Sequence, residues 1–181
     1  GNHLVSENGT ITESDIMLDS PNNNFATANP LAIWGWTDNT GVCALSNGNL
    51  HVNATSNQVQ MAKVNFLLTG KTYWEVIPLT QKYQVFGLGE EFYDGQSGLS
   101  DGAGGAKDGL NVYVNEGTEY TSFRTGGSIT NTNISGSFPI TPNDVVQFAY
   151  DADTGKIWFA RNNIWYGSGD PAGGNNPVAT F

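Results

Sequence analysis

The sequence predicts an all-β protein, folded as an antiparallel two-sheet β-sandwich, and three observations carry this prediction. Only 13% of the 181 residues are charged while 23 are glycine, a composition typical of many short strands joined by tight turns. Several apolar runs are short and rich in β-branched and aromatic residues, and no window has the period of an amphipathic helix. Clusters of Asn, Asp and Gly separate these runs, as expected for turns.

The first part of the chain is expected to contain a lead-in segment and the start of the sandwich. Residues 1–24 are polar and turn-rich, with apolar residues for one short strand. The sandwich domain is predicted to span residues 25–181. Asn47-Gly48, between Leu45 and Val52, predicts a β-hairpin because this dipeptide readily adopts the positive φ angles of a type I′ turn.

The middle of the chain alternates between strand patterns and one long loop. Residues 71–78 are rich in aromatic and β-branched residues, and residues 83–89 continue in the same way. Residues 94–109 are rich in glycine and show no hydrophobic period, which predicts a long loop. Residues 110–114 alternate between apolar and polar side chains and return the chain to a sheet.

The end of the chain gives the clearest pattern. Strands are predicted over 144–150 and 156–160, and a third begins at Ile164. The segment 151–155 reads Asp-Ala-Asp-Thr-Gly and predicts the first connecting turn. Asn162-Asn163 predicts the second, because asparagine tolerates the left-handed region of backbone space.

Charge and cysteine content narrow the function classes. The formal net charge of −10 repels phosphate backbones, and the seven Lys and Arg residues form no run, so nucleic-acid binding is not expected. No apolar run approaches membrane-spanning length, so membrane insertion is not expected. The single cysteine, Cys43, excludes an internal disulfide and is predicted to be a small buried side chain.

The block from Asp144 to Pro177 resembles the SPRY domain, a concanavalin A-like jelly-roll sandwich. The block contains a strand, an Asp-x-Asp-Thr-Gly turn, an aromatic strand, an Asn-rich hairpin and a Gly- and Pro-rich loop. Upstream, Gly-Lys-Thr-Tyr-Trp-Glu-Val at 70–76 and Phe-Gly-Leu-Gly at 86–89 are similar to two further strands of that family. The resemblance implies a module that binds protein or peptide partners through loops and has no enzymatic activity.

The segments 19–31 and 45–50 resemble the opening of SPRY-like domains in bacteriophage structural proteins. This resemblance implies a virion component made in the host cytoplasm, assembled as a homo-oligomer within a particle. Its place would be a tail fibre or other surface appendage. Its partners would be a protein or glycan on the host surface, or neighbouring virion subunits. Two alternatives stay open: an architectural capsid or tail decoration protein, and a carbohydrate-binding module of a glycan-active protein.

The family usually continues beyond the Pro-rich loop with further core strands, whereas this sequence ends at Phe181. The sandwich is therefore expected to be incomplete at its C-terminal end. Either a neighbouring chain or segment completes the sheet, or the sequence is part of a longer protein.

The residue types used in catalysis do not occur at the spacings that the known mechanisms need. Glycosidases need two carboxylates set across a cleft. Glu90 and Glu91 are adjacent and would point to opposite faces of a strand, and so would Glu116 and Glu119. The two histidines lie far apart in the sequence and next to no cysteine, so a zinc site or a catalytic triad lacks its parts. The sequence thus predicts a protein that is not an enzyme.

No cofactor is expected, although calcium is a candidate for the glycine-rich loop. Asp94, Asp101 and Asp108 could supply the hard oxygen ligands that calcium prefers. An acidic surface that serves solubility explains the same residues. Asp151 and Asp153 are interpreted as turn residues, since aspartate caps turns without any metal.

Aromatic residues near loops are the candidates for a binding surface. Phe92, Tyr93 and Asp94 join a predicted strand end to the glycine-rich loop, and form the first candidate contact patch. Trp34, Trp36 and Trp165 also lie near loops, where they could anchor a protein or stack on sugars. Packing of the sandwich ends explains the same three tryptophans, while Trp74 and Trp158 are predicted to be buried.

Overall fold

The computed structural model describes residues 26–35, 43–55, 60–64, 68–80, 84–89, 109–114, 120–125, 128–134 and 136–181. The chain divides into two compact units, Gly1–Leu67 and Leu68–Phe181. The predicted lead-in segment 1–24 and its boundary with the sandwich at residue 25 lie outside the described residues.

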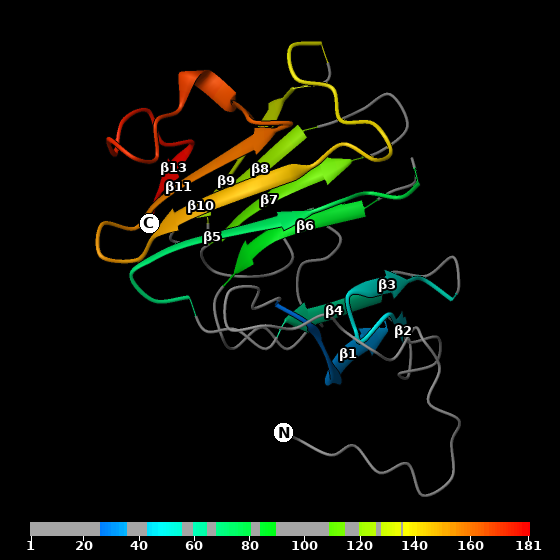
Figure 1. Cartoon of the computed structure of the whole chain (residues 1–181). Helices are drawn as coiled ribbons and strands as arrows, with labels where there is room; N and C mark the ends of the chain where they lie inside the picture. Colours follow the sequence, from blue (N-terminus) through cyan, green and yellow to red (C-terminus); the bar gives the residue numbers. More distant parts are fainter. Residues whose placement is uncertain are drawn as a thin grey trace, which may run out of the picture. The chain divides into compact units, whose positions relative to one another are not determined.

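Two antiparallel strand pairs make up the described part of the first unit (Figure 1). The pairs are β1 (Ala28–Gly35) with β4 (Gln60–Val64), and β2 (Ala44–Ser46) with β3 (His51–Asn53). The predicted hairpin is confirmed, but its loop has four residues instead of the two of a type I′ turn. Asn47, Gly48 and Asn49 have φ angles of 53°, 62° and 65°. Three successive left-handed residues are feasible because glycine and asparagine tolerate this region best.

Cys43 precedes β2 and is buried, as its apolar sequence neighbours predict. Burial raises the pKa of the Cys43 thiol above its usual value. A thiol with a raised pKa is largely protonated at neutral pH, so Cys43 behaves as a small apolar side chain.

The second unit begins with a sheet built around β10, called here the β10 sheet. Its order is β12-β11-β10-β5, and β13 pairs with the same edge of β11 as β12 does, at the other end. The strands are β5 (Lys71–Val76), β10 (Val146–Asp151), β11 (Lys156–Arg161), β12 (Ile164–Trp165) and β13 (Ala179–Thr180). All neighbours are antiparallel. The strands β5, β10, β11 and β12 agree with those predicted from the sequence, whereas β13 was not predicted.

The other sheet of the second unit is called here the β7 sheet, and it has the order β6-β7-β8-β9. Its antiparallel strands are β6 (Gln84–Gly89), β7 (Gly109–Val114), β8 (Tyr120–Thr125) and β9 (Ser128–Asn133). The sequence analysis missed β8 and β9. Their signal is Gly126-Gly127 between two Thr-containing runs, a dipeptide typical of two-residue hairpins.

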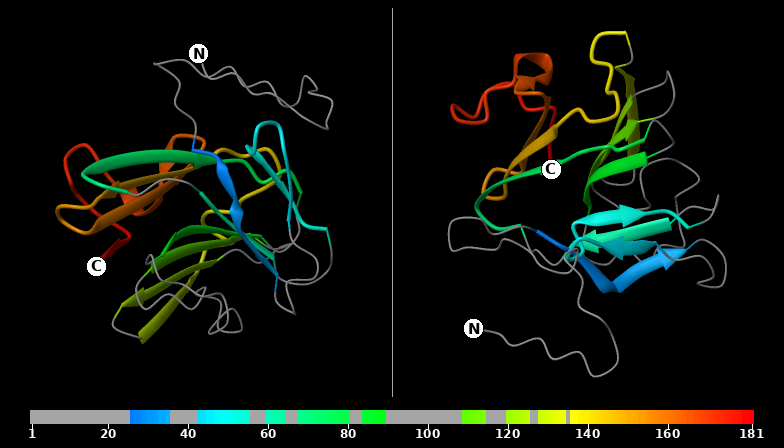
Figure 2. Two further views of the ribbon diagram at one scale, coloured as in Figure 1. Left: turned by 90° about the horizontal axis from the view of Figure 1, so that it is seen from below. Right: turned by 45° about the vertical axis from the view of Figure 1, so that its right-hand side comes forward.

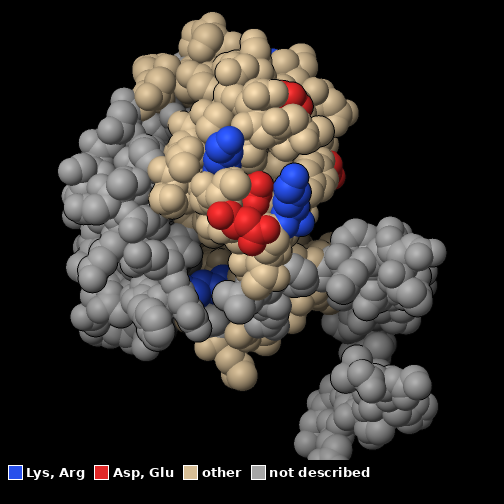
Figure 3. Space-filling model, turned by 90° about the vertical axis from the view of Figure 1, so that its left-hand side faces the viewer, with Lys and Arg blue, Asp and Glu red and all other residues tan. Residues whose placement is uncertain are grey.

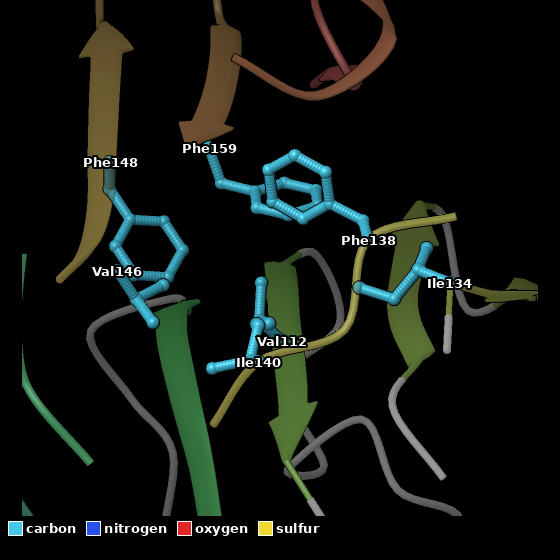
Figure 4. Close-up of a cluster of buried hydrophobic side chains, with 7 residues drawn as sticks. All are labelled: Val112, Ile134, Phe138, Ile140, Val146, Phe148 and Phe159. Atoms are coloured by element: carbon cyan, nitrogen blue, oxygen red, sulfur yellow. The ribbon is translucent and has the colours of Figure 1, made fainter. Parts of the chain in front are cut away.

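The two sheets of the second unit lie face to face, as the two views in Figure 2 show. Val146 and Phe148 of β10 and Phe159 of β11 pack with Val112 of β7, and all four are fully buried. Side chains from the segment that follows β9 close the same cluster (Figure 4): Ile134, Phe138 and Ile140. The predicted class, an antiparallel two-sheet β-sandwich, is therefore confirmed.

Aromatic contacts fix the geometry of this core. The ring of Trp74 on β5 stacks on Phe148, with ring centroids 5.1 Å apart and planes 10° from parallel. Phe138 meets Phe159 edge to face at 5.5 Å, and the Arg161 guanidinium lies 5.1 Å from the centre of the Phe138 ring. Each of the two aromatic ring pairs is worth about 1 kcal/mol beyond the apolar area that it buries.

The turns of the final hairpins form as the sequence predicts. Asp151 accepts a hydrogen bond from the backbone N–H of Asp153 through Oδ1 at 3.1 Å, and Gly155 ends the turn with a φ of 67°. Asn162 and Asn163 connect β11 to β12 with φ angles of 50° and 66°. Two left-handed central residues are typical of a type I′ turn. Asn163 here takes the position that glycine holds in the more usual Asn-Gly turn.

We predict that Phe148→Ala lowers the free energy of unfolding of the second unit by about 4 kcal/mol, because a fully buried aromatic side chain is lost and its cavity cannot close. Urea unfolding followed by tryptophan fluorescence measures the change. As a control, Leu79→Ala removes a side chain that is 54% exposed and should change stability by less than about 0.5 kcal/mol. Equal effects of the two substitutions would contradict the described core.

Candidate functional site

The candidate site lies on the outer face of the β10 sheet, the face turned away from the core. Successive side chains of a strand point to opposite faces, so the residues on either side of Phe148 point outward. Strand pairing then arranges the outward residues in three rows. Taken from β5 through β10 to β11, the rows are Glu75–Gln147–Ala160, Tyr73–Ala149–Trp158 and Lys71–Asp151–Lys156.

Gln147 is the centre of a hydrogen-bond network on this face. It is 3% exposed, and it is the one buried polar side chain among the described residues. Its Nε2 donates to the Tyr73 hydroxyl and to Asn163 Oδ1, both at 2.7 Å, and its Oε1 accepts from the backbone N–H of Asn163 at 2.6 Å. These bonds compensate the loss of water around a buried amide and fix which way the amide points.

Tyr73 and Glu75 extend this network to the surface. The Tyr73 hydroxyl donates to Glu75 Oε1, which also accepts a longer bond of 3.3 Å from Gln147 Nε2. Burial of the hydroxyl and its hydrogen bond to the Glu75 carboxylate raise the pKa of Tyr73. The hydroxyl thus stays protonated at neutral pH, and Tyr73 as a whole is 51% exposed.

A second group of hydrogen bonds fixes the hairpin that carries Asn163. Asn162 Nδ2 donates to Asp144 Oδ1 at 2.6 Å, and Asn162 Oδ1 accepts from the backbone N–H of Val145 at 2.8 Å. Asp144 Oδ2 also accepts from the backbone N–H of Thr141 at 2.7 Å. Partial burial acts to raise the pKa of Asp144, but the hydrogen bonds from Thr141 and Asn162 outweigh it and lower the pKa.

Trp158 is buried, as predicted, but the structure places it on the outer face. It is 2% exposed, and its indole Nε1 donates to the backbone carbonyl of Asn175 at 2.7 Å. Gly169 lies against the same ring, since a Cβ added there would be 2.9 Å from Trp158 Cδ1. The segment that connects β12 to β13 therefore folds over the edge of the outer face and covers this tryptophan.

Internal hydrogen bonds give that connecting segment a defined shape. It begins with a short 3-10 helix, η3 (Tyr166–Ser168). Asp170 accepts from the backbone N–H of Gly173 at 2.9 Å and from the Asn175 side chain at 3.0 Å, and these two bonds lower its pKa. Lys156 Nζ donates to the carbonyl of Gly174 at 2.9 Å, which joins the segment to the third row.

The described residues include two of the predicted site residues. Trp34 belongs to β1, where it pairs with Met61. Trp165 belongs to β12, is partly buried, and pairs with Ala160, so it extends the row that contains Gln147. The other predicted positions lie outside the described residues: Trp36, Phe92, Tyr93, Asp94, Asp101 and Asp108.

Sequence reasoning missed the Tyr73–Glu75–Gln147–Asn163 network, called here the Gln147 network. One signal was present, since Gln147 interrupts an otherwise apolar strand that later proves to be central. A glutamine at such a position needs hydrogen-bond partners. Its partners are 74 and 16 residues away along the chain, so they could not be named before the strand register was known.

Within the described ranges, no group of three or more His, Cys, Asp and Glu side chains is close enough to hold a metal ion. No helix among them is long and apolar enough to cross a membrane. Comparisons with known proteins gave no match to a family model, a curated protein or a solved structure. The resemblance to SPRY domains thus rests on the sequence motifs alone.

We predict that Asn163→Ala destabilises the second unit by about 2–3 kcal/mol and Asn163→Gly by about 1 kcal/mol. Both substitutions remove the acceptor for Gln147 Nε2, but alanine also strains a backbone with a φ of 66°, which glycine adopts freely. Urea unfolding of both variants measures the difference. The neighbouring Ile164→Ala is a control, because Ile164 is 60% exposed. Equal stability of the alanine and glycine variants would contradict the described turn.

Proposed function

We propose that this chain is a non-enzymatic binding module of a phage virion structural protein, part of a tail fibre or other surface appendage, that recognises a host-surface or virion partner. The observation that carries the proposal is the Gln147 network. It holds an exposed tyrosine and an exposed carboxylate in fixed positions on β5, the last strand in the described order of the β10 sheet. The SPRY-like and phage-like motifs of the sequence support the virion context.

The organisation of the site favours recognition. Binding surfaces combine aromatic side chains with a few fixed polar groups, and fixing them beforehand lowers the entropy lost on binding. Asn163 on the hairpin and Gln147 on the strand hold Tyr73 and Glu75 without the involvement of a long loop. A site on the strands of a sandwich is more rigid than one on loops, which favours a surface that keeps its shape before a partner arrives.

The spacing of carboxylates favours binding over glycoside hydrolysis. Glu75 lies in the first row and Asp151 in the third, so their positions along the strands are four residues apart. With a rise of about 3.3 Å per residue this separation is roughly 13 Å. Glycosidases place their two carboxyl groups between about 5 and 9.5 Å apart.

We predict that the purified chain binds to host cells of the phage that encodes it, or to that phage's own particle proteins, in a saturable manner. Competition with virus attachment separates the two partners, because only a host-surface module blocks attachment. Tyr73→Ala should weaken the binding at least tenfold, while Val52→Ser, a change at an exposed residue of the first unit, should leave it unchanged. Absence of binding to both cells and particle proteins would refute the proposal.

A further inference from the structure

We infer that the outer face of the β10 sheet binds a neutral saccharide, with the ring of Tyr73 as the surface on which a sugar stacks and with Glu75 and Asn163 as its hydrogen-bonding partners. This inference rests on the proposed binding function and names the ligand class of the same site. Three independent features of the face support it: an exposed aromatic ring, unused polar groups beside that ring, and a balanced local charge.

The first feature is the availability of the Tyr73 ring. Tyr73 is 51% exposed, and its hydroxyl is engaged by Glu75 and Gln147. The exposed part of the side chain therefore presents mainly ring. Ala149, its neighbour in the second row, carries only a methyl group, so β10 places no large side chain next to the ring. Aromatic side chains with one apolar body and one polar tip suit ligands that have both apolar C–H faces and hydroxyls.

The second feature is a pair of polar atoms that make no hydrogen bond within the described part of the chain. Oε1 of Glu75 accepts from Tyr73 and Gln147, whereas its Oε2 has no hydrogen-bond partner among the described residues. Asn163 uses Oδ1 and its backbone N–H toward Gln147, and its Nδ2 likewise has no partner among the residues with described positions. Both side chains are exposed. The site thus offers a carboxylate acceptor and an amide donor near one ring.

Sugar hydroxyls match this pair because each hydroxyl both donates and accepts hydrogen bonds. A carboxylate oxygen takes the proton of one hydroxyl, and an amide N–H₂ donates to the oxygen of another. Hydrogen bonds to a charged acceptor are the stronger kind, so Glu75 is expected to contribute more than Asn163. The Gln147 network holds both groups before the ligand arrives, which limits the entropy lost on binding.

The third feature is charge, which favours a neutral ligand over an acidic one. The three rows contain two lysines and two carboxylates, so their formal charges cancel: Lys71, Lys156, Glu75 and Asp151. Asp151 lies between the two lysines, and Figure 3 shows acidic atoms flanked by basic ones on the described surface. The whole chain carries −10, which repels anionic saccharides at longer range.

The dimensions of the face suit one or two sugar rings. Three rows on alternate residues span roughly 13 Å along β5 and β10, which lie roughly 5 Å apart. On β11 the outward residues Ala160 and Trp158 are buried, so the open part of the face lies over β5 and β10. The segment that covers Trp158 borders the face on the β11 side, since Asn175 and Gly169 lie on that indole. A short neutral oligosaccharide end is therefore the class of ligand that we assign to this surface.

The test is a glycan array followed by isothermal titration with the full chain. We expect binding to neutral hexose or N-acetylhexosamine oligosaccharides and none to sialylated or sulfated ones. Tyr73→Ala should weaken binding at least tenfold, Tyr73→Trp should retain it because a stacking ring remains, and Glu75→Gln should weaken it several-fold. Val52→Ser is the matched surface control. Thermal melting of each variant identifies any loss of affinity that comes from unfolding.

Several outcomes would overturn the inference. They are binding to no neutral glycan, equal binding to sulfated glycans, or a folded Tyr73→Ala variant with unchanged affinity. A cell-binding arm separates this failure from failure of the proposed function: periodate destroys the vicinal diols of surface glycans, whereas protease removes surface proteins. Periodate should abolish binding. If binding is lost after protease but not after periodate, the saccharide inference is refuted and the proposed binding function stands. If the chain binds neither cells nor particle proteins, the inference and the proposed function are both refuted.

Discussion

The rest of the second unit depends on one constraint, the two-residue alternation of β10 at the centre of its sheet. Val146 and Phe148 point into the space between the sheets and are fully buried, so the strand cannot shift by one residue without exposing them. The same register places Gln147 and Ala149 on the outer face. One strand register thus determines both the packing of the core and the arrangement of the outer face. A stable core therefore also fixes the geometry of the outer face.

The outer face in turn depends on two short segments that follow β11. The Asn162-Asn163 turn places a side chain and a backbone N–H against Gln147, and these give the buried amide hydrogen-bond partners on the outer face of the sandwich. The segment between β12 and β13 covers Trp158 through the Asn175 carbonyl. These two segments shape the outer face of β10, while the opposite face of the same strand packs in the apolar core.

The sequence predicted the parts of this arrangement that depend on local chemistry. The β10–β11 hairpin follows from apolar runs around an Asp-x-Asp-Thr-Gly turn, and the Asn162-Asn163 turn follows from the tolerance of asparagine for positive φ. The hairpin of β8 and β9 was missed because its residues alternate only weakly in polarity. The Gln147 network was missed because it joins residues far apart in the chain, and only the strand register brings them together.

The most direct test of this account is nuclear magnetic resonance on the Gln147 side-chain amide. We predict slow exchange of its two protons with water and nuclear Overhauser effects from them to the Tyr73 ring, since Nε2 lies 2.7 Å from the tyrosine oxygen. Overhauser effects to Phe159 or Val112 would instead place Gln147 between the sheets. That result would contradict the register on which both the core and the outer face depend.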